Sequence, residues 1–162
     1  MFRVGIITAS DKGSRGERED ISGQTIADMI KDIGEVCQYV IVPDDERALS
    51  ATMKHMADNQ GIDLILTTGG TGLSPRDVTP DATLAVIDKI VPGIAEAMRA
   101  ESLKKTSRAM LSRAVAGVRG RTLIINLPGS PKGVRECLEV VLPALDHGLA
   151  IMTGKASECG QK

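Results

Sequence analysis

Four short aliphatic runs, each of strand length, most constrain what this chain can fold into. They cover residues 4–9, 39–42, 62–66 and 123–127. Nearly continuous apolar runs of this length are typical of strands that are buried on both faces, as in a mostly parallel sheet. The sequence therefore predicts a sheet whose main strands run in parallel.

Helical patterns separate these runs. Apolar residues recur at steps of three and four in residues 26–33, 49–57 and 134–149, so each pattern buries one stripe. Strand–helix alternation predicts an α/β sandwich with right-handed crossovers. Residues 111–118 and the turn at Gly120 predict one antiparallel pairing with the last strand. We expect one domain over residues 1–152 and a frayed tail over residues 153–162.

A glycine-rich run follows the third strand. It reads Thr68-Gly69-Gly70-Thr71-Gly72, with three glycines within four positions. Such a run lets the backbone approach a ligand closely and turn its N–H groups toward an anion. The spacing fits neither GxxxxGK[ST] nor GxGxxG, so neither a P-loop ATPase nor an NAD enzyme is indicated. A structural turn needs one glycine, so the run favours ligand binding.

The segment after the glycine-rich run contains acids and a helix start. Asp77 comes first, Thr79 is predicted to cap the next helix, Pro80 to begin it, and Asp81 to lie in its first turn. An acid beside a phosphate-binding loop would repel the ligand unless a cation lies between them. Asp77, together with Asp44 after the second strand, is therefore a predicted holder of Mg²⁺.

Three other strand–helix junctions carry candidate ligand contacts, each with a simpler capping alternative. Strand carboxyl ends share one edge in such sheets, and ligands bind in the crevice there. After the first strand, Ser10, Asp11, Asp20 and Ser22 lie in a long loop, in which Asp20 or Ser22 would serve as a helix cap. Asp44 follows the second strand, where an acid also complements a helix dipole.

The fourth junction contains a predicted anion site. Its candidates are Asn126, Pro128, Gly129, Ser130, Pro131 and Lys132. Ser130 reads as a helix cap with Pro131 as the first helical residue. The free N–H groups and dipole of that helix attract anions, and Lys132 adds a positive charge, although simple capping remains an alternative.

Composition excludes several classes of protein. Phe2 and Tyr39 are the sole aromatic residues and the net charge is −1, so a nucleic-acid partner is not expected. The sequence contains neither an apolar run long enough to cross a membrane nor a signal peptide, which favours the cytoplasm. Three scattered cysteines favour free thiols, and the two histidines have no zinc-ligand spacing.

Several motifs, taken in order, carry a resemblance to a known family. They are GGTG at residues 69–72, RDVTPDAT at 76–83, AMLSR at 109–113 and LPGSPK at 127–132. Together they resemble the MogA/MoaB family, which includes the G domains of plant and animal molybdenum-cofactor proteins. The resemblance covers nearly the whole chain, up to about residue 152. It departs at Ser130, where relatives often carry Asn or Gln.

The resemblance implies an α/β/α sandwich that assembles as a homotrimer. It also implies a molybdopterin adenylyltransferase, which uses MgATP to adenylylate molybdopterin, releases pyrophosphate and passes its product to a molybdate-inserting partner enzyme. By motif, Asp77 and Asp44 match the family's two important acids, and the four junctions match its nucleotide- and pterin-binding loops.

Two alternative functions follow from the same residues. Some MoaB-type members do not catalyse adenylylation, so a pterin carrier with the same pocket remains a second hypothesis. The loop from Ser10 to Asp20, which contains Gly16, resembles the MogA type. A Ser-His-Asp hydrolase would need a GxSxG motif and a well-placed histidine, and the sequence offers neither.

Overall fold

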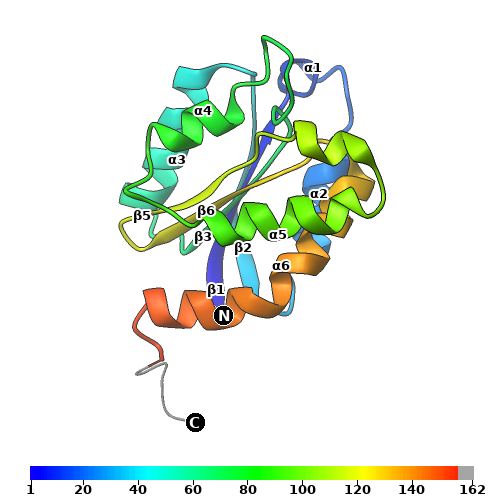
Figure 1. The fold of residues 1–162 in the computed structure, drawn as a ribbon. Coiled ribbons are helices and arrows are strands. Elements are labelled where there is room, and N and C mark those ends of the chain that lie inside the picture. Colours follow the sequence, from blue (N-terminus) through cyan, green and yellow to red (C-terminus); the bar gives the residue numbers. More distant parts are fainter. Residues whose placement is uncertain (157–162) are drawn as a thin grey trace.

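The computed structural model describes residues 1–156 and shows a six-stranded sheet with helices on both faces (Figure 1). Along the sheet the strand order is β2-β1-β3-β6-β5-β4. The strands are β1 (Phe2–Ala9), β2 (Gly34–Val42), β3 (Leu64–Thr68), β4 (Lys89–Ile90), β5 (Ala116–Arg119) and β6 (Thr122–Leu127). The four strands predicted from aliphatic runs are all present.

The sheet is mostly parallel, as predicted. β2, β1, β3 and β6 run in parallel, and their carboxyl ends are in register, with Thr8 beside Thr68 and Thr68 beside Leu127. The predicted antiparallel pairing joins β5 to β6. The two-residue strand β4 adds a second antiparallel pairing that the sequence analysis did not predict, because its exposed residues carry no strand pattern.

Helices cover the sheet in two outer layers, which confirms the α/β/α sandwich. α2 (Ile21–Met29), α5 (Pro92–Leu103) and α6 (Pro131–Met152) pack on one face. α3 (Glu46–Asn59) and α4 (Thr79–Leu84) pack on the other. Two short elements complete the fold: α1 (Asp11–Ser14) follows β1 along the chain, and the 3₁₀ helix η1 (Ser107–Leu111) follows α5.

The core is aliphatic on both sides of the sheet. Ile6 and Leu66 point into the layer beneath α2 and α6, whereas Ile7 and Ile65 point into the layer beneath α3. Burial on both faces explains the unbroken apolar runs, because successive side chains of a strand point to opposite faces. The methionines Met53 and Met56 of α3 are buried core residues, as expected from their place on the apolar stripe.

Some element bounds differ from the predictions. α2 ends at Met29, and Ile33 precedes β2, which begins at Gly34 rather than at residue 39. Exposed and half-buried side chains interrupt the apolar run of β2, so the sequence pattern did not indicate the first half of the strand. The loop after β1 contains the four-residue helix α1, capped by the side chain of Ser10.

The loops predicted to carry the site lie at the end of the molecule where α1 is labelled, away from the N-terminus (Figure 1). No helix within residues 1–156 is long and apolar enough to cross a membrane. α6 ends at Met152, and the predicted frayed tail falls partly on residues 157–162, which lie outside the described residues.

Candidate functional site

Hydrogen bonds join the first, third and fourth predicted junctions directly to one another. The Thr68 hydroxyl at the end of β3 donates to the Pro128 carbonyl at 2.6 Å. The buried Ser22 hydroxyl at the start of α2 donates to the Gly129 carbonyl at 2.7 Å. A Cβ at Gly129 would lie 3.4 Å from the Gly69 Cα, so the two glycine loops touch. The structure therefore gathers these loops on one edge of the sheet.

The glycine-rich loop needs its glycines for two physical reasons. Gly69 and Gly70 have φ values of +92° and +67°, a region that side chains disfavour. The space is also occupied, because a Cβ on Gly70 would collide with the Thr79 hydroxyl and lie 3.4 Å from Asp44 Oδ1. The loop therefore packs between the start of α4 and Asp44 of the second junction.

Asp11 and Asp44 join the first junction to the second. The Asp11 N–H donates to Asp44 Oδ2, and the Asp44 N–H donates to Asp11 Oδ1, both at 3.0 Å. Arg76 donates to both Asp11 oxygens, at 3.1 and 2.9 Å. This guanidinium lowers the pKa of the Asp11 carboxyl. Asp11 is therefore committed to an ion pair, which makes it a support of the site rather than a metal ligand.

Asp44 and Asp77 are two of the four acids that line the cavity beside the glycine-rich loop, together with Glu19 and Asp20. Burial raises the pKa of Asp44, and the nearby charges of Asp11 and Asp77 raise it further. The Asp77 carboxylate accepts a bond from the Ser74 N–H at 3.1 Å and lies against Gly72. The carboxylates of Asp44 and Asp77 thus line the same cavity as the glycine-rich loop.

Asp20 also lines this cavity, but its oxygens already accept several hydrogen bonds. Asp20 Oδ1 caps α2 by accepting from the Gly23 N–H, and Oδ2 accepts from Thr8 at 2.6 Å and from the Tyr39 hydroxyl. Burial and the Asp20 carboxylate raise the pKa of Tyr39. The capping alternative for Asp20 is therefore confirmed, and its carboxylate holds the first junction in place.

The start of α4 differs from the predicted cap. Thr79 is the first residue of α4, Val78 is at the cap position without a side-chain bond, and Pro80 is the second helical residue. The reason is tertiary, since the Thr79 N–H donates to the Gly70 carbonyl. Its hydroxyl faces Gly70, where no hydrogen-bond partner was found for it among residues 1–156.

Two further predicted contacts are engaged within the protein. Asp81 pairs with both terminal nitrogens of Arg113, at 2.9 and 3.2 Å. The buried Asn126 amide donates to Thr67 and Thr83, and its oxygen accepts the Val115 N–H. Both residues support the loops, and the amide N–H groups of Asn126 are not free for a ligand.

The fourth junction behaves as predicted at its helix start. The Ser130 hydroxyl caps α6 by accepting the Gly133 N–H at 3.0 Å, with Pro131 as the first helical residue. Lys132 is exposed and lies 4.0 Å from Glu136 on the same helix. The start of α6 therefore has the capped geometry that the sequence predicted.

Two cavities lie on either side of the glycine-rich loop. The first, of about 530 Å³, is lined by Asp20, Asp44, Gly69, Gly70 and Asp77 together with Gly129 and Pro131. The second, of about 560 Å³, is lined by Thr71 and Gly72 on one wall. Pro131 faces the first cavity, while Ser130 and Lys132 face the second, so both cavities open at the start of α6.

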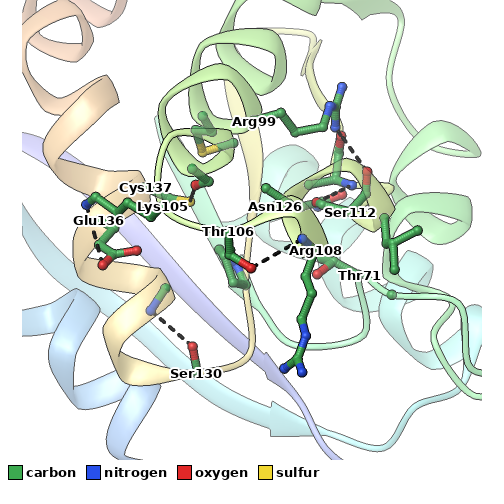
Figure 2. Close-up of a pocket in the computed structure, with 18 of the residues that line it drawn as sticks. Thr71, Arg99, Lys105, Thr106, Arg108, Ser112, Asn126, Ser130, Glu136 and Cys137 are labelled. Atoms are coloured by element: carbon green, nitrogen blue, oxygen red, sulfur yellow. Dashed lines mark hydrogen bonds and ion pairs between the residues drawn. The ribbon is translucent and has the colours of Figure 1, made fainter.

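The second cavity combines cations with apolar walls, as Figure 2 shows. Arg99, Lys105, Arg108 and Lys132 contribute positive charges, Glu136 pairs with Lys105 at 3.4 Å, and Met98 and Cys137 contribute apolar surface. Burial raises the pKa of Cys137, so its thiol stays neutral. Cys37 and Cys137 are both free, as predicted, and Cys159 lies outside the described residues.

Arg99, Lys105, Arg108, Met98 and Cys137 were not among the site residues predicted from the sequence. The segment 109–113 carried part of the resemblance, yet Ser112 and Arg113 were given no role. No local pattern assigns a role to Arg99 or Lys105, because a cation on a helix usually faces solvent. A signal was available only for Arg113, as an arginine within a motif that accompanies the glycine-rich loop.

Among the residues that the structure describes, no group of three or more His, Cys, Asp or Glu side chains is arranged to hold a metal by itself. Mg²⁺ usually takes only one or two protein carboxylates and completes its shell with water and substrate phosphates. Asp44 and Asp77 have the required chemistry. Burial is the largest cause of the raised pKa of Asp44, and a bound cation would also relieve the repulsion from Asp77 that adds to it.

The fold and the site together define a class: an α/β domain with a mostly parallel sheet and a crevice beside a glycine-rich loop at the carboxyl edge of its strands. Residues 5–147 match the family described as "Probable molybdopterin binding domain". The chain belongs to this MogA/MoaB family of molybdopterin-binding domains, which confirms the resemblance.

Individual relatives agree with this membership. The molybdopterin adenylyltransferase of Helicobacter pylori strain J99 is 41% identical over 164 residues, which cover 99% of this chain and 93% of the relative. The solved structure of a molybdopterin biosynthesis enzyme MoaB from Thermus thermophilus is 56% identical, with a TM-score of 0.91, and the match covers 98% of this chain and 100% of that one. A MogA structure is 42% identical, with a TM-score of 0.86, over 93% and 99% of the two chains.

Proposed function

We propose that this protein transfers AMP from MgATP to the terminal phosphate of molybdopterin and releases pyrophosphate. The observation that carries the proposal is the pair of cavities that share the glycine-rich loop, one lined by four acids that include Asp44 and Asp77, the other by several cations. Relatives with about 40% identity over most of this chain carry the name molybdopterin adenylyltransferase.

The acid-lined cavity is the one we assign to MgATP. Asp44 and Asp77 would hold Mg²⁺, which supplies positive charge to the phosphate oxygens. The backbone N–H of Gly70 would donate to those oxygens, as glycine-rich loops do, whereas the Gly69 N–H already donates to the Leu127 carbonyl. In this assignment the crowded Gly70 lets the triphosphate approach the loop without a side chain between them.

The cation-lined cavity is the one we assign to molybdopterin. Met98 and Cys137 offer apolar surface to the flat pterin, while Lys105, Arg108 and Lys132 complement its phosphate. The helix dipole at the start of α6 adds to this attraction. The two substrates would then meet at the glycine-rich loop, which borders both cavities.

The transfer needs no general base from the protein. A phosphate oxygen of molybdopterin attacks the α-phosphorus of ATP and forms the new P–O bond. The bond between the α-phosphorus and the bridging oxygen breaks, and pyrophosphate leaves with the electron pair. The protein acts by positioning and by charge stabilisation, which fits a site that combines a glycine-rich loop with the carboxylates of Asp44 and Asp77.

The remaining expectations are part of the same proposal. On the resemblance we infer a homotrimer, a molybdate-inserting enzyme as the recipient of the adenylylated product, and a cytoplasmic location. For the homotrimer, the exposed Leu103 of α5 is available for a contact between subunits, whereas Met98 of the same helix is buried in the core.

The experiment that tests the proposal compares the wild-type protein with Asp77→Asn. With MgATP and molybdopterin we expect the wild type to release pyrophosphate, and the variant to be slower by roughly 100-fold or more. The melting temperature should change little, because an amide can still accept the Ser74 N–H. A variant with normal turnover and a lowered melting temperature would contradict the catalytic assignment.

A pterin carrier is the second candidate, favoured by the 56% identity to a protein named MoaB. A carrier would bind molybdopterin tightly without releasing pyrophosphate from MgATP. A wild-type protein that behaves in this way would replace the enzyme proposal with the carrier.

A further inference from the structure

Arg113 forms several hydrogen bonds to the segment that runs from the glycine-rich loop to Asp77. Its Nε donates to the Gly72 carbonyl at 3.0 Å, and one terminal nitrogen donates to the Asp77 carbonyl at 2.7 Å. Its main-chain N–H donates to the Thr71 carbonyl at 2.9 Å. One residue therefore binds both ends of the segment that runs from the glycines to Asp77.

The guanidinium itself is held rigidly. The two terminal nitrogens donate to the two oxygens of Asp81, which lies in the first turn of α4. Asp81 raises the pKa of Arg113, and Arg113 lowers that of Asp81, so both stay charged. A planar fork held on one side by a carboxylate has fixed donor directions on the other side.

Arg113 is placed behind the cavities rather than in them. Ser112 and Ala114 line the second cavity, but Arg113 lines neither. All three of its side-chain nitrogens already donate to Gly72, Asp77 or Asp81. A guanidinium has only five N–H groups, so little donor capacity is left for a phosphate.

We propose that Arg113 is a positioning residue, which sets the shape of the glycine-rich loop and the place of Asp77 for the transfer. The inference rests on the proposed function. Asp77 would hold the metal through its carboxylate, while its carbonyl is fixed by Arg113 and its Oδ2 by the Ser74 N–H. Without Arg113, residues 72–77 lose their attachment to α4, and the acid moves relative to the phosphates.

The chain offers a matched control. Arg119, the last residue of β5, pairs with both oxygens of Asp58 at 3.0 and 2.7 Å and donates to the Val86 carbonyl at 2.8 Å. It thus makes the same kinds of bonds as Arg113, but at the other end of β5. Arg119→Ala reports what the loss of such a pair does to the fold alone.

The first measurement is hydrogen–deuterium exchange in a peptide that covers residues 69–77. We expect faster exchange in Arg113→Ala than in the wild type, and no change in Arg119→Ala. Arg113→Lys should resemble Arg113→Ala, because a single ammonium cannot bridge two carbonyls and a carboxylate in fixed directions. Wild-type exchange in both Arg113 variants would overturn the inference, whatever their turnover.

The second measurement is turnover. In Arg113→Ala we expect kcat for pyrophosphate release to fall by on the order of 100-fold, as misplacement of about 1 Å can do, while KM for molybdopterin changes little. Added guanidinium should restore part of this loss, and Arg119→Ala should keep the wild-type kcat. If Arg113→Ala and Arg119→Ala lower the melting temperature alike and both keep the wild-type kcat, Arg113 has only a structural role.

The two measurements separate this inference from the proposed function. A wild-type protein that releases no pyrophosphate, with accelerated exchange in the Arg113 variants, would refute adenylyl transfer and leave the loop support standing. If Arg113→Ala fails to fold, Arg113→Lys keeps the length and charge of the side chain. Wild-type exchange and kcat in Arg113→Lys would then overturn the inference.

Discussion

Gly70→Ala should damage the site in a way that the structure allows us to work out. Gly70 has a φ of +67°, and a residue with a Cβ in that region costs about 1–2 kcal/mol. For a domain of this size, such a loss lowers the melting temperature by roughly 2–8 °C. The added Cβ would also collide with the Thr79 hydroxyl, which belongs to α4 and is fully buried. In Gly70→Ala the backbone of the loop must therefore shift, in addition to keeping an unfavourable φ.

Gly120→Ala separates strain from collision. Gly120 has a φ of +57° in the turn between β5 and β6, and a Cβ there meets nothing within 4 Å. Its loss of stability should equal the backbone strain alone, so Gly70→Ala should lose more. Only Gly70→Ala should weaken binding of MgATP, as measured by calorimetry, because only its loop lines the acid-lined cavity.

A double mutant locates the collision. Thr79→Ala removes the hydroxyl that the new Cβ would meet, so Gly70→Ala/Thr79→Ala should be more stable than the sum of the single effects by about 0.5–3 kcal/mol. Thermal denaturation of the four proteins measures this coupling. Equal losses in Gly70→Ala and Gly120→Ala, with no coupling to Thr79, would refute the close approach of the loop to α4.

Two further predictions concern charge and assembly. Because burial and the neighbouring acids raise the pKa of Asp44, protons should compete with Mg²⁺ above the usual range of an aspartate, so Mg²⁺-dependent ATP binding should weaken as the pH falls through that raised pKa. Asp44→Asn should remove this pH dependence in calorimetry, and an unchanged profile would contradict the assignment. Light scattering should report a trimer at micromolar concentration, and a monomer would contradict the inferred assembly.

Hydrophobic patterning was sufficient to predict the layers and the main strands. An apolar run such as that before Ala9 is buried on both faces, which only a central strand covered by helices provides. Local chemistry was likewise sufficient for the cap at Ser130, because a hydroxyl followed by proline acts within four residues. The order of segments along the chain placed the glycine-rich loop and Asp77 after a strand. Because parallel strands end at one edge of the sheet, the sequence also predicted the edge at which the loop lies.

Only the tertiary structure decided which candidate residues pair with one another and which line a cavity. Arg76 and Asp11 are 65 residues apart, and Arg113 lies 32 residues from Asp81, so no local pattern could pair them. Contact with Gly70 turned the Thr79 hydroxyl away from its predicted cap. Pairing of this kind depends on distances set by packing, whereas burial periodicity and capping depend on neighbours in the chain. For that reason the sequence alone determined the sheet, its covering layers and the position of the glycine-rich loop, while packing decided which acids support that loop and which face the cavity.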